Sequence, residues 1–508
     1  MTKATTLSLG GAEDGPVVQL TAMSNRHGLI AGATGTGKTI SLQVMAENFA
    51  RAGVPVFAVD AKADLAGVSK PGKPHKEVDR RVELCGITDY AQRPYATLHW
   101  DLFGKRGHPV RTTISEMGPD ILSALLDLNE NQTGLLYACF AIADDEGMLL
   151  LDLKDLRSLL NFMSENAKAL RGTYGNIAPA SIGAIQRRLL VLEEQGGDQF
   201  FGEPALALSD LMLKDFGGNG VISLLDAERL LRESPKLYAA FVLWLISELF
   251  ENLPEAGDPD RPALVLFFDE AHLLFKNMPQ GLLDKVEQVF RLIRSKAVGI
   301  YLVTQSPTDI PEAILGQLGC KVQHALRAFT PKDQRTIRGV AQGMRNDRGL
   351  DVEKAITTLG VGEALVSTLD EKGAPTSVVV ATMAPPESRI GAINQKERKE
   401  NIGNSPIGGR YDQVVDRHSA YELLQARAEE NARLLEEEER AQKEAKAREK
   451  EARARERASN RRRPAQTTKR GGRKRQSIGE AMLKSAARSV GRSLGSKLVR
   501  GLLGSLLK

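Results

Sequence analysis

The stretch that decides the fold is Gly-Ala-Thr-Gly-Thr-Gly-Lys-Thr at residues 32–39. It follows a short apolar run, Gly28 to Ala31, and precedes residues 40–50, whose apolar side chains have helical spacing. Strand, glycine-rich loop and helix in this order are the context of a P-loop, whose backbone N–H groups surround the phosphates of a nucleotide while Lys38 reaches the β- and γ-phosphates. The predicted nucleotide-binding residues are Gly32, Ala33, Thr34, Gly35, Thr36, Gly37, Lys38, Thr39 and Ile40.

A second motif lies more than two hundred residues further along, where the apolar run 264–268 ends in Asp269 and Glu270. A buried strand would expose both carboxylates at the sheet edge where the P-loop lies. We therefore expect Asp269 and the Thr39 hydroxyl to hold Mg²⁺ and Glu270 to polarise the attacking water. Gln305, at the end of the next predicted strand, would sense the γ-phosphate. The alternative is that the acids and Gln305 only cap the helices that follow them.

Arginine side chains compete for the role of stabilising the transition-state charge. Arg291 and Arg294 lie three residues apart on one predicted helix face, from which they would reach the nucleotide of a neighbouring subunit in a ring. Arg327, at the end of another predicted strand, would act within its own subunit. Residues 60–64, Asp-Ala-Lys-Ala-Asp, follow the second predicted strand and either line the site, contact a neighbour or form a plain strand-to-loop exit.

The remaining pattern predicts an α/β fold with a mainly parallel central sheet, since several short apolar runs read as strands covered on both faces. The predicted strands are 28–31, 54–60, 96–100, 221–225, 263–269, 298–305, 321–327, 364–367 and 377–381. We expect five segments: the P-loop and first strands in 1–115, a mainly helical insertion in 116–255, the remainder of the core in 256–390, a linker and charged helical stalk in 391–458, and a basic linker with an amphipathic helix in 459–508.

The charge of the chain is unevenly distributed. Residues 459–508 carry fourteen Lys and Arg against one acid, Glu480, so this tail has a charge of +13 and leaves −8 for residues 1–458 of the total of +5. Residues 478–508 repeat apolar side chains every fourth position beside a basic stripe. The tail would contact nucleic acid or an anionic membrane, or it would only solubilise the chain.

Length and composition indicate a globular protein, because 508 residues with 42% hydrophobic content suffice for a sizeable core. The sequence contains no run of eighteen uncharged apolar residues and no signal-peptide pattern, so we expect a cytoplasmic protein. Cys85, Cys139 and Cys320 are isolated from one another. Their spacing favours neither a disulfide framework nor a zinc site.

Taken in order, these motifs resemble the HerA/FtsK superfamily of ring-forming ATPases, and most closely its bacterial HerA-like members. The resemblance covers roughly residues 5–390. It implies a RecA-like ATPase core, a homo-hexameric ring with Mg-ATP at the subunit interfaces and, as in the better known relatives, movement of double-stranded DNA or protein through the ring. The matching stretches are Gly-Ala-Thr-Gly-Thr-Gly-Lys-Thr at 32–39, Val-Asp-Ala-Lys-Ala-Asp-Leu at 59–65, Phe-Phe-Asp-Glu-Ala-His-Leu-Leu-Phe at 267–275, Arg-Leu-Ile-Arg-Ser-Lys at 291–296 and Val-Thr-Gln-Ser-Pro at 303–307.

The sequence departs from this family on either side of the matching region. HerA carries a β-barrel domain ahead of the ATPase core, whereas about thirty residues precede the P-loop here. We find no winged-helix DNA reader of the FtsK kind toward the C-terminus. DNA as the substrate is therefore implied by analogy, while the motifs themselves support the nucleotide chemistry.

Two functions follow as hypotheses. The first is an ATPase of the DNA translocase or helicase type, with sequence-independent contacts from basic groups in a channel and a possible nuclease or client protein as partner. The second is an ATP-switched assembly, a membrane-docked scaffold or a protein-pumping ATPase without DNA activity. The first predicts ATP hydrolysis that duplex DNA stimulates. The second predicts tail-dependent sedimentation with anionic vesicles.

Overall fold

The computed structural model describes residues 6–257, 259–276, 278 and 280–461, and within them one sheet of twelve strands dominates. The strand order is β2-β1-β12-β11-β10-β3-β9-β8-β4-β7-β5-β6. The strands are β1 Thr6–Ala12, β2 Gly15–Leu20, β3 Gly28–Ala31, β4 Val56–Asp60, β5 Thr97–Asp101, β6 His108–Pro109, β7 Ile222–Asp226, β8 Leu264–Phe268, β9 Val298–Thr304, β10 Cys320–His324, β11 Glu363–Ser367 and β12 Val379–Met383.

The sheet consists of a parallel block and an antiparallel block. From β10 through β3, β9, β8, β4, β7 and β5 to β6, each neighbouring pair is parallel. From β10 through β11, β12 and β1 to β2, each pair is antiparallel. The carboxyl ends of the parallel strands therefore share one edge of the sheet, where ligands bind in open α/β sheets.

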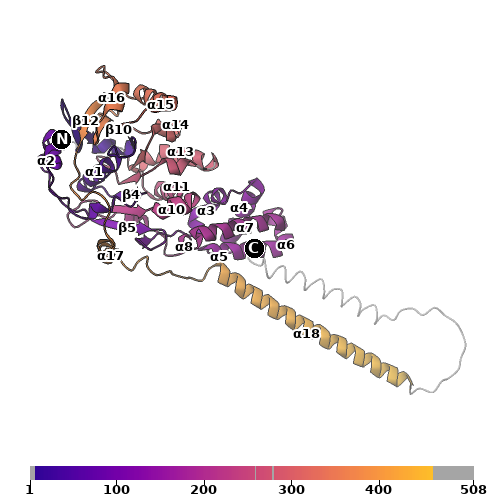
Figure 1. Ribbon diagram of the computed structural model, residues 1–508. Coiled ribbons are helices and arrows are strands. Elements are labelled where there is room, and N and C mark those ends of the chain that lie inside the picture. The colour runs from indigo at the N-terminus through magenta and orange to yellow at the C-terminus, as the bar shows by residue number, and fades with distance from the viewer. Residues whose placement is uncertain (1–5, 258, 277, 279, 462–508) are drawn as a thin grey trace. The chain divides into compact units, whose positions relative to one another are not determined.

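The helices are distributed along the chain, and Figure 1 labels many of them. They are α1 Lys38–Arg51, α2 Lys76–Leu84, α3 Ile114–Leu125, α4 Glu130–Asp145, α5 Leu153–Glu165, α6 Ala167–Tyr174, α7 Pro179–Leu192, α8 Asp198–Phe200, α9 Leu208–Leu211, α10 Glu228–Glu233, α11 Pro235–Asn252, α12 His272–Phe275, α13 Gln280–Leu292, α14 Glu312–Leu315, α15 Pro331–Gln342, α16 Val352–Thr358, α17 Gln395–Gly403 and α18 Ala420–Arg461.

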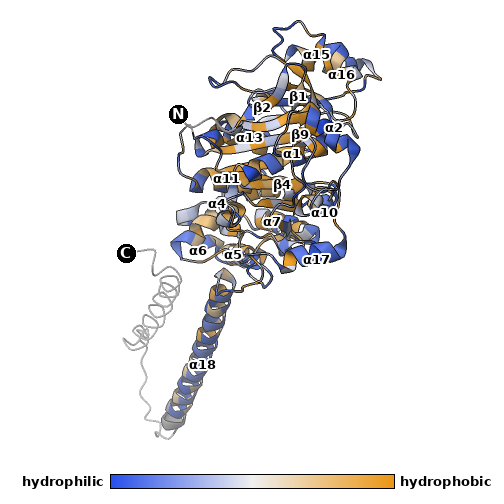
Figure 2. Ribbon diagram, turned by 90° about the vertical axis from the view of Figure 1, so that its left-hand side faces the viewer, coloured by the Kyte–Doolittle hydropathy of each residue, from blue (hydrophilic) through white to orange (hydrophobic). Residues whose placement is uncertain are grey.

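The two faces of the sheet are covered by different helices because side chains alternate along each strand. On one face Phe49 of α1 contacts Phe267 and Tyr301, with ring centroids 6.2 and 5.6 Å apart. On the other face Phe57 of β4 meets Phe241 of α11 at 6.3 Å. All five residues of β4 are buried, which explains its continuous apolar sequence, and Figure 2 shows this strand as predominantly hydrophobic.

The predicted α/β fold with a mainly parallel sheet is confirmed, and each of the nine predicted strands is present within a few residues of its expected bounds. The sequence analysis missed β1, β2 and β6. In β1 the glycines hide the strand pattern, yet they are required there: a Cβ on Gly10 would lie 2.3 Å from the Thr382 carbonyl oxygen, and one on Gly11 would lie 2.2 Å from that of Leu84.

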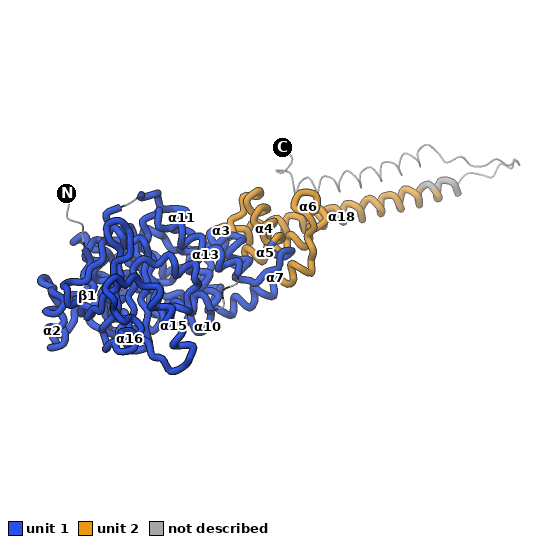
Figure 3. The backbone as a smooth tube through the Cα atoms, turned by 90° about the horizontal axis from the view of Figure 1, so that it is seen from above, with its two compact units in different colours: residues 1–133, 151–153, 185–416 blue, residues 134–150, 154–184, 417–508 orange. Residues whose placement is uncertain are grey.

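The chain forms two compact units, which Figure 3 distinguishes by colour. One comprises residues 1–133, 151–153 and 185–416 and holds the sheet, including β7, which lies within the segment 116–255 expected to be mainly helical. The other comprises residues 134–150, 154–184 and 417–508 and is helical where it is described. The five segments expected from the sequence remain a prediction.

Helix α18 covers most of the predicted charged stalk within 391–458, and beyond its first turns its described side chains are almost all exposed and mostly hydrophilic (Figure 2). The predicted basic linker from residue 462 and the amphipathic helix over 478–508 lie outside the described residues. Among the described helices, none has both the length and the apolar character that crossing a membrane requires. The three cysteines are buried as free thiols.

Candidate functional site

The P-loop connects β3 to α1 and is fixed to the ends of both neighbouring strands. The Gly32 N–H donates to the Thr304 carbonyl oxygen at the end of β9, at 3.3 Å. The Ala33 N–H donates to the Ala325 carbonyl oxygen just after β10, at 2.8 Å. The loop is therefore held in place before any nucleotide binds, which lowers the cost of ordering it around phosphates.

Two glycines of the loop are required by close contacts as well as by backbone conformation. Gly32 has φ +154°, and a Cβ there would lie 2.5 Å from the Cβ of His324. Gly37 has φ +114°, and a Cβ there would lie 3.3 Å from the Cα of Gly362. The Gly362 N–H in turn donates to the Thr36 carbonyl oxygen at 3.0 Å. Side chains at either glycine would push the loop away from β10 and from the turn before β11.

Helix α1 begins at Lys38, so the N–H groups of Lys38, Thr39 and Ile40 have no partner within the helix and are available to an anion. Lys38 as a whole residue is 8% exposed, and its Nζ donates to the Ala33 carbonyl oxygen at 3.1 Å. Burial lowers the pKa of this ammonium, which the nearby carboxylates of Glu270 and Asp269 partly offset. The lysine thus lies folded over the loop, close to the acidic pair.

Asp269 follows β8 and is buried at this same edge. Its Oδ1 accepts the Glu270 N–H at 2.9 Å, whereas its Oδ2 has no hydrogen-bond partner among the described residues. Burial, and secondarily the Glu270 carboxylate, raises the pKa of Asp269 to about 6. A buried carboxylate oxygen without a partner is costly, and a bound cation or its water shell would satisfy it.

Glu270 has φ +47°, an uncommon conformation for a residue with a side chain. Its Oε1 lies 2.6 Å from the Lys62 Nζ, and its Oε2 accepts from the Gln305 Nε2 at 3.3 Å and lies 3.3 Å from the His272 Nδ1. Burial alone would raise its pKa, but the hydrogen bond and charge of Lys62 outweigh this effect and lower it. Glu270 is thus kept ionised, as a group that polarises water must be.

The loop after β4 positions Lys62. The buried Asp60 carboxylate accepts the N–H groups of Asp64 and Leu65, both at 3.1 Å, so residues 60–65 form a tight turn that carries Lys62 to Glu270. Burial in the first place, and then the charge of Asp64, raises the pKa of Asp60 to about 7. The sequence left several interpretations of residues 60–64 open. This geometry favours the one in which the segment lines the site, beside the acidic pair.

His324 at the end of β10 is a residue that sequence reasoning missed. Its Nδ1–H donates to the Glu363 carbonyl oxygen at 2.9 Å, so its Nε2 accepts from the Ser41 hydroxyl, also at 2.9 Å. Burial, together with the charge of Lys38, lowers its pKa to about 4, so the ring is neutral at pH 7. It joins α1 to β11 beneath the P-loop. The predicted strand 321–327 placed His324 in its middle, so nothing in the sequence indicated that this residue ends the strand.

Two of the three candidate arginines, Arg291 and Arg294, lie away from this edge. Arg294 lies in the short helix η4, Ile293–Lys296, which precedes β9, so it lies at the edge where the parallel strands begin. Arg291 and Arg294 line a cavity of about 520 Å³ there. Arg327 is exposed and lies two residues beyond Ala325, at the P-loop edge. The structure thus brings Lys38, Asp269, Glu270 and Gln305 together and leaves Arg291 and Arg294 apart from them within one subunit.

The residues present fit a nucleotide with a divalent cation. The loop offers backbone donors and the Lys38 ammonium to phosphates, while Thr39 and the unpartnered Asp269 oxygen offer oxygen ligands of the kind Mg²⁺ prefers. A glycine-rich loop at the carboxyl end of β3, one strand removed from an acidic pair at the end of β8, in the strand order β10-β3-β9-β8-β4, defines a P-loop ATPase with a RecA-like core. The chain belongs to the helicase HerA-like C-terminal family, whose model matches residues 6–508. It is therefore an ATPase of the HerA type.

The solved structures similar to this chain include coupling proteins and a VirB4 protein. The bacterial conjugative coupling protein TrwBdeltaN70 in its unbound monoclinic form is 16% identical, over 78% of this chain and 92% of that one, with a TM-score of 0.47. The plasmid coupling protein TrwB in complex with ADP and Mg²⁺ is 18% identical over the same shares, with a TM-score of 0.48. VirB4 of Thermoanaerobacter pseudethanolicus is 15% identical over 75% of this chain and 97% of that one, with a TM-score of 0.47. No curated protein matches the sequence.

Proposed function

We propose that this chain is a ring-forming motor that hydrolyses ATP to move double-stranded DNA. The observation that best supports ATP hydrolysis is that Lys38 lies close to Asp269 and Glu270 at one edge of the sheet, although the acids are remote from it in sequence. Membership of the helicase HerA-like family supports DNA as the substrate. DNA contacts would be made to the phosphate backbone and would therefore be independent of sequence.

The roles of the site residues follow from their positions. The P-loop N–H groups and Lys38 would hold the β- and γ-phosphates, and Thr39 with Asp269 would hold Mg²⁺, which neutralises charge on the phosphates. Glu270, kept ionised by Lys62, would orient and polarise the attacking water. Gln305 donates to Glu270 and would exchange this bond for one to the γ-phosphate or the water.

The position of the arginines supports a ring, with six subunits by analogy. Arg294 lies at the edge of the sheet opposite to its own P-loop, so it would act on the nucleotide of a neighbouring subunit. Arg327 at the P-loop edge would act within its own subunit. A cytoplasmic location and a nuclease or client protein as partner belong to the same proposal.

The test is the rate of ATP hydrolysis of the full chain with and without duplex DNA, measured together with the mass of the oligomer. We expect stimulation by DNA that falls steeply with salt, because binding releases counterions. A variant that ends at Arg461 separates the channel from the basic tail. Stimulation that survives this truncation assigns the DNA contact to the described part of the chain. Active hydrolysis without any DNA effect, accompanied by tail-dependent binding to anionic vesicles, would replace the motor with the membrane-docked or protein-pumping alternative.

A further inference from the structure

A cavity of about 550 Å³ lies directly beside the P-loop. It begins at Gly37, Ile40 and Ser41, at the start of α1, and is enclosed by α2, by the turn at 361–362 and by residues 383–390, which follow β12 and which we call the strap. Its volume is in the range of small-molecule sites in proteins. The cavity is thus continuous with the phosphate-binding loop.

The order of the strands fixes which end of a bound triphosphate would face this cavity. On one side of β3 lie β9 and β8, which end in Gln305 and in the Asp269–Glu270 pair; on the other lie β10, β11 and β12. The γ-phosphate must face the pair that polarises the water. The α-phosphate, and the nucleoside attached to it, then points toward β10–β12, where the cavity opens.

The walls of the cavity suit a flat apolar group. Two of the apolar side chains at its mouth, Val361 and Ile390, are 71% and 58% exposed, although large aliphatic side chains are usually buried. An aromatic base lying on them would remove this surface from water. The apolar side chains of the lining are Ile40, Val78, Tyr90, Val361, Met383, Ala384, Pro385, Pro386 and Ile390.

Arg81 of α2 holds the walls together. Its guanidinium donates to three backbone carbonyl oxygens, those of Val361 at 3.0 Å, Gly362 at 2.9 Å and Met383 at 3.2 Å, and pairs with Glu77 at 2.9 Å. One side chain therefore connects α2, the turn and the strap. A site whose walls are fixed in advance loses little conformational entropy when a ligand enters.

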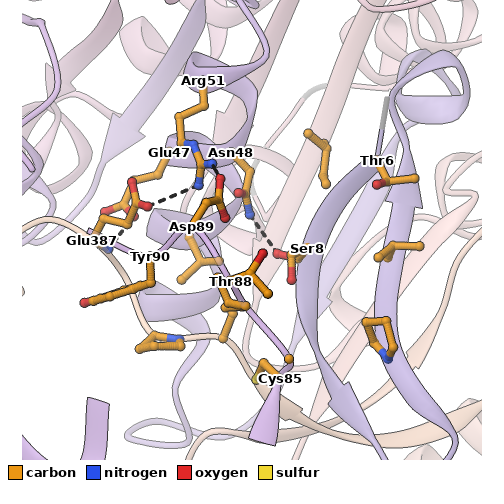
Figure 4. Close-up of a pocket in the computed structure, with 18 of the residues that line it drawn as sticks. Thr6, Ser8, Glu47, Asn48, Arg51, Cys85, Thr88, Asp89, Tyr90 and Glu387 are labelled. Carbon is orange, nitrogen blue, oxygen red and sulfur yellow. Dashed lines mark hydrogen bonds and ion pairs between the residues drawn. The ribbon is translucent and has the colours of Figure 1, made fainter. Parts of the chain in front are cut away.

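The strap is also anchored from behind, on α1 itself (Figure 4). The buried Glu47 carboxylate accepts the N–H groups of Glu387 at 2.7 Å and Ser388 at 3.2 Å, and Arg51 pairs with the Glu387 carboxylate at 3.1 Å. Figure 4 shows these side chains directed toward one another beside a second cavity of about 370 Å³, whose lining includes Tyr90. The strap is thus part of the rigid core beside the P-loop.

Most polar groups around the cavity already have partners, which limits hydrogen bonding to a base. The carbonyl oxygens of Val361, Gly362 and Met383 accept from Arg81, and that of Pro386 accepts from Tyr90 at 2.9 Å. A site reads the edge of a base only through groups that are available to it, whereas apolar contact discriminates weakly between similar ligands. The side chains already engaged are Ser41, Glu77, Arg81, Tyr90, Ser388 and Arg389.

We propose that this cavity binds the nucleoside of a purine nucleoside triphosphate mainly by apolar contact, so that the site accepts GTP as well as ATP. The inference rests on the proposed function, because it requires the P-loop to hold the triphosphate. The recognising elements are α2 and the strap, and the specificity is for a purine ring system rather than for adenine.

The test measures the binding of Mg-ATP, Mg-GTP and Mg-tripolyphosphate to the full chain by calorimetry. We expect the dissociation constants of ATP and GTP to differ by less than about 200-fold, the most by which apolar pockets discriminate similar ligands. A preference for ATP over GTP of more than about 200-fold would overturn the inference, because it demands hydrogen bonds to the base. Failure of the unmodified chain to bind any of the three would overturn the proposed function itself.

Two variants test whether the nucleoside binds in this cavity. Val78→Trp fills the cavity and Ile390→Ser removes an apolar contact at its mouth, while Val414→Trp, at a site 68% exposed and outside the cavity lining, is the matched control. We expect Val78→Trp to weaken ATP and GTP by about tenfold or more, Ile390→Ser to weaken both several-fold, and tripolyphosphate to remain within about twofold in every variant. Unchanged ATP binding in both cavity variants would place the nucleoside elsewhere while leaving the P-loop assignment intact.

Discussion

The pair of Lys62 and Glu270 offers a quantitative test of the site. The Lys62 Nζ lies 2.6 Å from the Glu270 Oε1, and the two side chains are 46% and 7% exposed. Exposed pairs contribute about 0.2–1 kcal/mol, whereas losing one partner of a fully buried pair costs about 3–5 kcal/mol. Because one partner here is half exposed, we expect Lys62→Met to destabilise the sheet-containing unit by about 1–2 kcal/mol.

The measurement is the thermal midpoint of the nucleotide-free protein. A loss of this size corresponds to a decrease of about 2–6 °C for a unit of this kind. In the Glu270→Gln background the same lysine substitution should change the midpoint by less than about 1 °C, because the charge that Lys62 neutralises is already absent. The pKa of Glu270 is lowered in the folded state. The pair therefore stabilises the protein at pH values above 4.5, the ordinary pKa of a glutamate, and this stabilisation is lost as the pH falls through the lower pKa of the folded state.

Hydrolysis provides an independent measurement on the same variant. Without Lys62 the pKa of Glu270 rises, so the acid side of the pH–rate profile should move to higher pH. Lys62→Arg should retain the charge and most of the profile, and Lys372→Met, at an exposed lysine, should leave both measurements unchanged. Equal losses of stability in the Glu270 and Glu270→Gln backgrounds, with an unmoved acid limb, would refute the coupling.

Three further predictions follow from the same geometry. Lys38→Ala should abolish nucleotide binding, whereas Glu270→Gln should bind ATP normally and turn over at least ~100-fold more slowly, as equilibrium binding and steady-state assays would show. Arg294→Ala should lose hydrolysis and regain part of it when mixed with Lys38→Ala subunits; no regain would place its role within one subunit. Burial raises the pKa of Glu47 to about 7, so the stability that the protonated carboxyl contributes is present below pH 4.5 and is lost as pH rises to 7. The free energy of unfolding should therefore decline over this range by on the order of 3 kcal/mol. Glu47→Gln should flatten this decline when melting is measured as a function of pH.

The motifs that the sequence made visible are those whose signal is local. The P-loop and the strand before Asp269 are contiguous runs whose conformation follows from glycine, apolar and acidic residues in order. Their meeting at one edge could be predicted because parallel strands end at the same edge of a sheet. Such local patterns predicted every strand of the parallel block except β6, which is only two residues long. They also missed β1 and β2, whose sequences contain glycine.

The contacts that the sequence concealed are those between segments with no pattern of their own. The approach of Lys62 to Glu270 depends on a turn held by Asp60, and the position of His324 depends on the register of β10 against β3 and β11. The cavity proposed for the nucleoside is assembled from α2, which ends at Leu84, and from the turn at 361–362 and the strap at 383–390. Proximity of this kind is a property of the tertiary fold, and a single sequence carries no periodic trace of it.

The distribution of charge around the sheet bears on assembly. At the carboxyl edge the acids Asp269 and Glu270 are matched by cations from the same subunit, Lys38 and Lys62. The cavity at the opposite edge is lined by five cationic side chains and, among its described lining residues, by no acid: Arg26, Arg291, Arg294, Lys321 and Arg345. Arg345 of this set also pairs with Asp347 at 2.7 Å. Several cationic side chains lining one cavity favour the approach of an anion. In the proposed ring, the triphosphate bound at the carboxyl edge of a neighbouring subunit would be such an anion, so a single repeated interface would bring the two edges together.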